Sequence, residues 1–120
     1  MDRDTALKTL AGLRLAVGVT SWAAPNFGGK LFGLEPEANP QAPYLGRLFG
    51  IRDVALGLGP LRAKKKAQNN WIELGIMCDA ADVVSAFLGG GKGYLSPTTT
   101  AMVAAPAIGA TALGIIALNN

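Results

Sequence analysis

The chain has 120 residues, a formal net charge of +3, one cysteine and no histidine. At this length we expect one domain that spans residues 1–120. Without histidine, Ser-His-Asp catalysis, imidazole-ligated haem and most zinc sites are excluded. A single cysteine excludes an internal disulfide and any CxxC motif. We therefore expect neither a cofactor nor a metal ion.

The composition is typical of closely packed membrane helices. Half of the residues are hydrophobic and 16 are glycine. Charged residues make up 16%, below the roughly 25% of an ordinary soluble domain. A soluble helical bundle, which is the alternative, would need a wide polar face on every helix. The composition therefore favours a membrane protein.

Four apolar segments approach the about 20 residues that a helix needs to cross a bilayer. They predict helices, in chain order, over residues 6–24, 44–61, 71–88 and 98–118. Pro25 ends the first helix, the proline-rich stretch 35–43 precedes the second, and the glycine-rich stretch 89–93 precedes the fourth. Between the first two helices, residues 27–34 are expected to form a short interfacial helix or a re-entrant turn.

Basic residues predict how these helices are oriented. The loop between the second and third helices holds four of them, Arg62, Lys64, Lys65 and Lys66, whereas each of the other two loops holds one. By the positive-inside rule, this loop and both termini lie in the cytoplasm. The sequence therefore predicts an all-α, four-helix transmembrane bundle with an N-in/C-in topology, which is a multi-pass protein of the inner (plasma) membrane.

Small residues predict where the helices meet. Gly46 and Gly50 form a GxxxG motif in the second helix, and Gly57 lies two turns further along the same side. In the third helix, Asp79 and Asp82 share one face with small residues. This pattern favours a compact four-helix bundle or a homo-oligomer of such units.

Several ionisable side chains fall where lipid would surround the predicted helices, and they are Arg14, Arg47, Arg52, Asp53, Glu73, Asp79 and Asp82. An unpaired charge at the bilayer centre costs at least about 2.5–3.5 kcal/mol. Arg47 and Glu73 lie near helix ends and can reach an interface. We expect the other five to meet at the bundle axis, either as a buried ion-pair network or as a polar pocket.

Chemistry at this cluster would depend on its carboxylates. Asp79 and Asp82 are one helical turn apart, so repulsion and burial are expected to raise the pKa of one of them. A carboxylic acid of this kind can donate or relay a proton. The candidate catalytic residues are Asp53, Asp79 and Asp82. The candidate ligand-binding residues are Arg14, Arg47, Arg52, Asp53, Asp79 and Asp82.

Residues 46–57, with the sequence G-R-L-F-G-I-R-D-V-A-L-G, resemble the signature segment of a known family. This is an uncharacterised family of small bacterial four-helix membrane proteins, distantly DoxX-like, with the pattern G-R-x-x-G-x-R-D-x-x-L-G. Pro25 and the Phe-Gly-Leu turn at residues 32–34 are similar to elements that precede this segment. The resemblance implies a four-helix bundle and singles out Arg47, Arg52 and Asp53, but it implies no reaction.

These features lead to two main hypotheses for the function. The first is a small integral membrane protein that binds a lipid-like ligand or a partner membrane protein through the buried Arg/Asp cluster. The alternative is an intramembrane acid/base enzyme, an isomerase or hydrolase, that acts on an apolar molecule such as an epoxide or isoprenoid. A small proton-coupled carrier is a third class and would require oligomerisation. Nucleic acid is not an expected partner, because three lysines beside apolar helices more often meet anionic lipid.

Overall fold

The computed structural model describes residues 1–120 and is entirely helical. Its elements, in chain order, are α1 (Arg3–Ala23), α2 (Pro25–Leu31), the 3-10 helix η1 (Pro36–Ala38), α3 (Ala42–Arg62), α4 (Lys65–Lys92) and α5 (Pro97–Leu118). The four long helices cover the four predicted segments. The short helix α2 begins at Pro25 and occupies the place where the sequence predicted a short interfacial helix or re-entrant turn.

The prediction of a four-helix transmembrane bundle is wrong. Only α5 is long and apolar enough to cross a membrane, judged by length and composition. The helices α1, α3 and α4 are long enough, but charges such as Arg14, Asp53 and Asp79 make them too polar for a membrane span. The multi-pass location in the inner membrane and the N-in/C-in topology depended on four spans and are corrected with the fold. One apolar helix is weak evidence for a membrane, because core helices of soluble proteins share its character.

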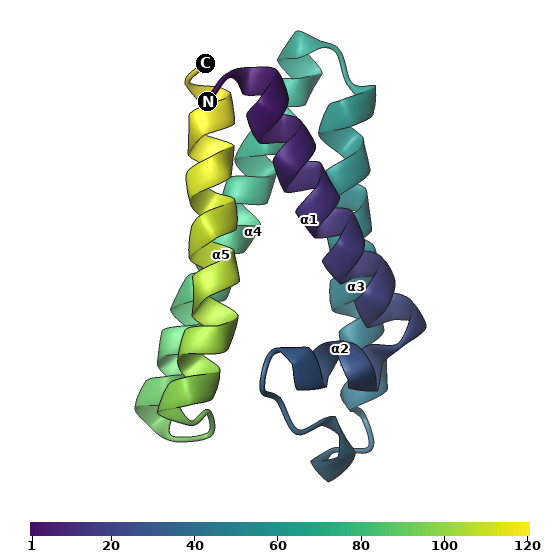
Figure 1. The fold of residues 1–120 in the computed structure, drawn as a ribbon, viewed down its shortest axis with the longest axis vertical. Helices are drawn as coiled ribbons and strands as arrows, with labels where there is room; N and C mark the ends of the chain where they lie inside the picture. Colours follow the sequence, from purple (N-terminus) through teal and green to yellow (C-terminus); the bar gives the residue numbers. More distant parts are fainter.

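The long helices form two antiparallel pairs, α1 with α3 and α4 with α5 (Figure 1). The pairs meet at one end of the molecule and spread apart toward the other. Both chain termini lie at the end where the pairs meet, which we call the joined end. The short helix α2 and η1 lie at the opposite, spread end, beside α1 and α3. This arrangement leaves the inner faces of the two pairs opposite one another.

Apolar packing and one arginine hold the joined end together. Buried side chains from three helices form a cluster there, namely Ala6, Leu7, Ile72 and Ala117. The Arg3 guanidinium donates hydrogen bonds to Gln68 (2.9 and 3.0 Å), to Asn69 (2.6 Å) and to the carbonyl of Ala117 (2.9 Å). Because these acceptors lie on α4 and α5, Arg3 ties the start of α1 to the other helix pair.

Glycine permits the close crossing of α1 and α3. A Cβ atom on Gly50 would lie 2.6 Å from the Gly18 carbonyl oxygen, and one on Gly18 would lie 2.7 Å from the Gly50 oxygen. Gly46 and Gly57 also face α1, so the predicted small-residue stripe is confirmed as a helix contact. The glycines therefore serve backbone packing between two helices, which requires no surrounding lipid.

A contact between distant segments bridges the spread end. The chain leaves α2 through Gly33, whose φ of +77° suits glycine. The Thr99 hydroxyl, at the start of α5, donates a hydrogen bond of 2.9 Å to the Gly33 carbonyl. Ser96 caps the same helix by accepting a hydrogen bond from the Thr99 amide. The segment that follows α2 is therefore attached to α5, across the space between the helix pairs.

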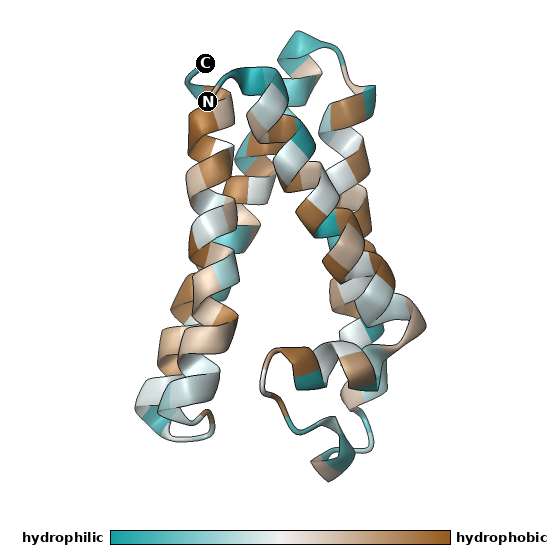
Figure 2. Ribbon diagram, in the orientation of Figure 1, coloured by the Kyte–Doolittle hydropathy of each residue, from teal (hydrophilic) through white to brown (hydrophobic).

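Much of the apolar surface remains exposed. Only ten hydrophobic residues are buried, and six of them are alanine, whereas large side chains such as Trp22, Phe87 and Ile115 are exposed. Figure 2 shows hydrophobic residues along the length of the long helices and hydrophilic ones around the loop between α3 and α4. Exposed apolar surface on this scale indicates contact with another apolar partner.

Candidate binding cavity

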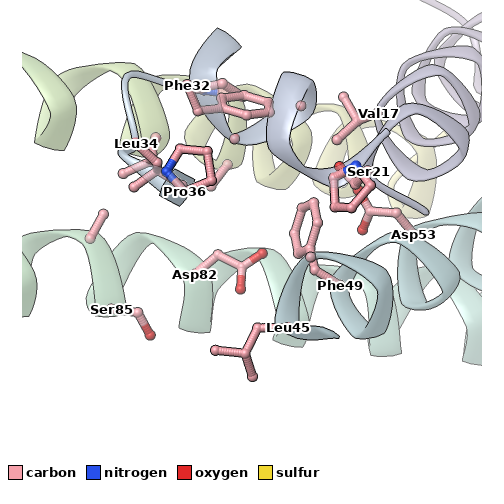
Figure 3. A pocket seen from close by; sticks show the side chains of 18 of the residues that line it. Val17, Ser21, Phe32, Leu34, Pro36, Leu45, Phe49, Asp53, Asp82 and Ser85 are labelled. Carbon is pink, nitrogen blue, oxygen red and sulfur yellow. The ribbon is translucent and has the colours of Figure 1, made fainter. Parts of the chain in front are cut away.

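A cavity of about 760 Å³ lies between the two helix pairs. The helices α1 and α3 line one side and α4 and α5 line the other, and α2 with the segment after it and the loop between α4 and α5 contribute the rest. Half of the lining residues are hydrophobic. Figure 3 shows Val17, Phe32 and Phe49 around this space, together with the carboxylates of Asp53 and Asp82. Its volume is in the range of about 300–1,000 Å³ that is usual for small-molecule sites.

One buried ion pair crosses from α1 to α4 beside the cavity. Arg14 donates two hydrogen bonds to Asp79, from Nη1 to Oδ1 at 3.0 Å and from Nη2 to Oδ2 at 2.5 Å. Both residues are buried, at 5% and 3% exposure. Such a two-bond contact between guanidinium and carboxylate is among the stronger interactions that side chains make. It connects the two helix pairs near the middle of the chain fold.

A second ion pair joins α3 to α4. Arg52 donates from Nη1 and Nη2 to the two oxygens of Asp82, at 3.1 and 2.6 Å. Its guanidinium also lies 4.8 Å from the centre of the Phe49 ring, a cation–π distance. Arg52 is half-buried and is not among the residues that line the cavity, whereas Asp82 and Phe49 are. Two side chains of the lining, Asp82 and Phe49, are therefore in contact with Arg52.

Asp53 lies between these two ion pairs and has no arginine hydrogen-bonded to it. Its Oδ1 atom is 3.5 Å from Arg52 Nη2 and 3.8 Å from Arg14 Nη1, and it is buried without a hydrogen-bond partner. Burial raises the pKa of Asp53, opposed by Arg52 and Arg14 and reinforced by Asp79 and Asp82. When all five groups are ionised, three carboxylates face two guanidinium groups, so the cluster carries one excess negative charge.

Helical spacing explains why the two aspartates of α4 meet different arginines. Asp79 and Asp82 are three residues apart, so they lie on the same side of α4 but point toward α1 and α3 respectively. Gly75 lies one turn before Asp79, and a Cβ atom there would be 2.8 Å from Arg14 Nη2. The glycine therefore leaves the space through which the guanidinium reaches its carboxylate.

The structure brings together five of the six residues predicted to bind a ligand, namely Arg14, Arg52, Asp53, Asp79 and Asp82. The sixth, Arg47, does not join them. Its Nε donates a 3.0 Å hydrogen bond to the Trp22 carbonyl, and its guanidinium lies 5.7 Å from the Trp22 ring. Glu73 is exposed. Both residues are therefore outside the cluster, and for Arg47, a predicted ligand-binding residue, its place near a helix end explains the difference.

We expected repulsion between Asp79 and Asp82 to raise the pKa of one of them, but the structure points to a different carboxylate. Each of the two has its own arginine, and the raised pKa belongs to Asp53, for which the sequence predicted no such shift. The apolar lining from the segment after α2, including Phe32 and Pro36, was also not predicted. Nothing in the local pattern of that segment places it against α5.

No group of three or more His, Cys, Asp or Glu side chains is arranged to hold a metal ion. Comparisons of the chain with protein-family models, with curated proteins and with solved structures found no match. The resemblance of residues 46–57 to a DoxX-like family therefore stays a prediction. Two residues of that block, Arg52 and Asp53, belong to the buried cluster.

Proposed function

We propose that this protein binds a lipid-like small molecule in the cavity between the helix pairs. The apolar tail would lie among the side chains of both pairs, and the polar end would meet the Arg/Asp cluster. The observation that carries the proposal is a largely apolar cavity lined by a buried carboxylate, Asp53, with an oxygen that lacks a hydrogen-bond partner.

A purely structural ion-pair network explains only part of this arrangement. Arg14 with Asp79 and Arg52 with Asp82 already satisfy one another through two hydrogen bonds each. Asp53 adds a third carboxylate, and leaving a buried acceptor unsatisfied costs about 1–3 kcal/mol. A ligand that donates a hydrogen bond to the Asp53 carboxylate would offset this cost, whereas a scaffold would be more stable without the carboxylate.

The apolar part of the proposed site predicts how affinity depends on tail length. Each methylene group that leaves water for an apolar cavity contributes about 0.8 kcal/mol. This corresponds to roughly fourfold tighter binding per methylene. Isothermal titration calorimetry of the full chain with octanol, nonanol and decanol measures the series. Affinity that is independent of tail length would contradict the proposal.

A pair of substitutions on α1 tests whether the cavity is the site. Val17 lines the cavity, while Val19, on the same helix, is 55% exposed and does not line it. Val17→Phe adds bulk inside the cavity and is expected to weaken decanol binding at least about tenfold, a change of roughly 1.4 kcal/mol. Val19→Phe is the matched control and should bind as the parent protein does. Equal weakening by both variants would place the binding elsewhere.

A second function, acid/base catalysis, is favoured by the raised pKa of Asp53 beside two arginines. A carboxylic acid that stays protonated closer to neutrality can protonate the oxygen of an epoxide, and water can then open the ring. Incubation with an alkyl epoxide, followed by mass spectrometry of the diol, tests this function. The product should form with the parent protein and be lost with Asp53→Asn, if that variant still binds decanol. Binding without any turnover would leave only the binding function.

The outer face of α5 suggests where a lipid-like ligand is acquired. This helix carries no charge, and it exposes Ile108 and Ile115. We propose that this face touches the bilayer surface that supplies the ligand. Flotation with phosphatidylcholine vesicles tests the contact, and the double variant Ile108→Lys/Ile115→Lys should float less than the parent protein. Unchanged flotation of this variant would contradict a role for α5.

A further inference from the structure

We infer that the polar end of the bound molecule is a hydrogen-bond donor without negative charge, a hydroxyl or a primary ammonium, and that the Asp53 carboxylate accepts its hydrogen bond. This inference rests on the proposed function and specifies the class of ligand. It begins from the one side chain that is nine-tenths buried, lines the cavity and keeps an oxygen without a partner.

The basic groups near the cavity are already occupied. Arg14 is the only basic residue that lines it, and both of its Nη atoms donate to Asp79. Arg52 uses both of its Nη atoms for Asp82. Its Nε is buried without a partner, but Arg52 does not line the cavity. Each guanidinium beside the cavity is therefore already paired with an aspartate, and a carboxylate or phosphate head would have to compete with Asp79 and Asp82 for it.

Ser85 and the acidic groups of the lining also favour a donor. Ser85 donates its hydroxyl proton to the Ala81 carbonyl at 2.8 Å, so this donor is engaged as well. The acidic residues of the lining are Glu35, Asp53, Asp79 and Asp82, which are all acceptors when ionised. The ionised carboxylates of the lining therefore present acceptors to a ligand, and the one in the cluster that lacks an arginine bonded to it directly is Asp53.

Charge balance excludes an anionic head. The cluster of two arginines and three aspartates has one excess negative charge when fully ionised, and an anionic head would add a second in a buried place. A hydroxyl head adds no charge and donates to the Asp53 carboxylate. An ammonium head donates to the same carboxylate and also neutralises the excess charge. The two heads share one chemistry, donation to a carboxylate.

Three amphiphiles with the same tail test this inference, namely decanol, decylamine and decanoate. At mildly alkaline pH, isothermal titration calorimetry with the full chain is expected to show decanol and decylamine binding at least about tenfold more tightly than decanoate. In Asp53→Asn the preference over decanoate should shrink to less than about threefold. Asp4→Asn removes the same charge at an exposed surface position and should keep the parent preference.

The outcomes separate the inference from the proposed function. Decanoate that binds as tightly as decanol would overturn the donor head and leave lipid-like binding intact. Failure of all three amphiphiles to bind would overturn the binding function itself. If Asp53→Asn does not fold by circular dichroism, the carboxyl carbon resonance of Asp53 in the parent protein decides the assignment. It should shift on addition of decylamine, and an unmoved resonance would contradict a role for Asp53.

Discussion

Arg14 on α1 and Asp79 on α4 form a two-bond ion pair that connects the two helix pairs beside the cavity. Neither residue is more than 5% exposed. The same contact therefore holds the fold together and shapes the polar part of the proposed site. It also orients Arg14 so that its other neighbour, Asp53, lies 3.8 Å away.

Removing one partner of this pair should be far more damaging than removing both. Asp79→Ala leaves Arg14 buried beside a single carboxylate, so we expect a loss of about 3–5 kcal/mol in the free energy of unfolding. Arg14→Met combined with Asp79→Leu replaces the pair with apolar groups, so this double variant should lose much less of the free energy of unfolding. Urea unfolding followed by circular dichroism measures both. A double variant that is less stable than the single variant would contradict this account.

Gly75 provides a second test of the position of Arg14. A Cβ atom at this place would lie 2.8 Å from Arg14 Nη2, so Gly75→Ala should push the guanidinium away from Asp79 and destabilise the protein by about 1–3 kcal/mol. Gly12, in α1, has nothing within 4 Å of its Cβ direction, so Gly12→Ala should stabilise by about 0.5–1 kcal/mol. Thermal melts compare the two. Similar effects of both substitutions would mean that Gly75 is not needed for the ion pair.

The close crossing of α1 and α3 should not tolerate a methyl group. In Gly50→Ala the new Cβ would lie 2.6 Å from the Gly18 oxygen and 2.7 Å from the Trp22 amide nitrogen, so the helices must separate. We expect a loss of about 1–3 kcal/mol. Gly109→Ala, on the open face of α5, is the control and should not destabilise. Chemical unfolding gives both values, and a neutral Gly50→Ala would show that this crossing is looser than described.

The buried Asp53 predicts a pH dependence of stability. Its pKa is raised in the folded protein, mainly by burial, with Arg14 on α1 and Asp79 and Asp82 on α4 facing it. The folded state therefore holds this proton more tightly than the unfolded chain, whose value is near 3.8. Its favourable contribution is complete below that value and is lost as pH rises through the folded pKa.

The difference in unfolding free energy between Asp53→Asn and the parent protein isolates this contribution. It should grow in favour of the variant as pH rises from below 3.8 and then level off. Asp2 and Glu37 have lowered pKa values and act in the opposite sense, but both proteins contain them, so their effect cancels. A difference that stays constant with pH would mean that the pKa of Asp53 is not raised in the folded protein.

Local pattern predicted the helices but not the medium around them. Proline at residue 25 and glycine around residue 93 end helices wherever the chain folds, so the four long segments were found. Apolar length and small residues were interpreted as a sign of lipid. Three of the four helices are too polar for that, and glycines such as Gly50 serve contacts between helices. Composition alone does not distinguish these two uses of small residues.

The sequence by itself determined which side chains had to find partners, because charges such as Arg14 and Asp79 within apolar helices are costly unless paired. Only the tertiary structure decided the pairing, since that depends on how the helices cross and rotate against one another. It joined Arg14 to Asp79 and Arg52 to Asp82, and it left Asp53 as the remaining carboxylate. The cavity is likewise a product of the fold, because its lining comes from segments that are far apart along the chain.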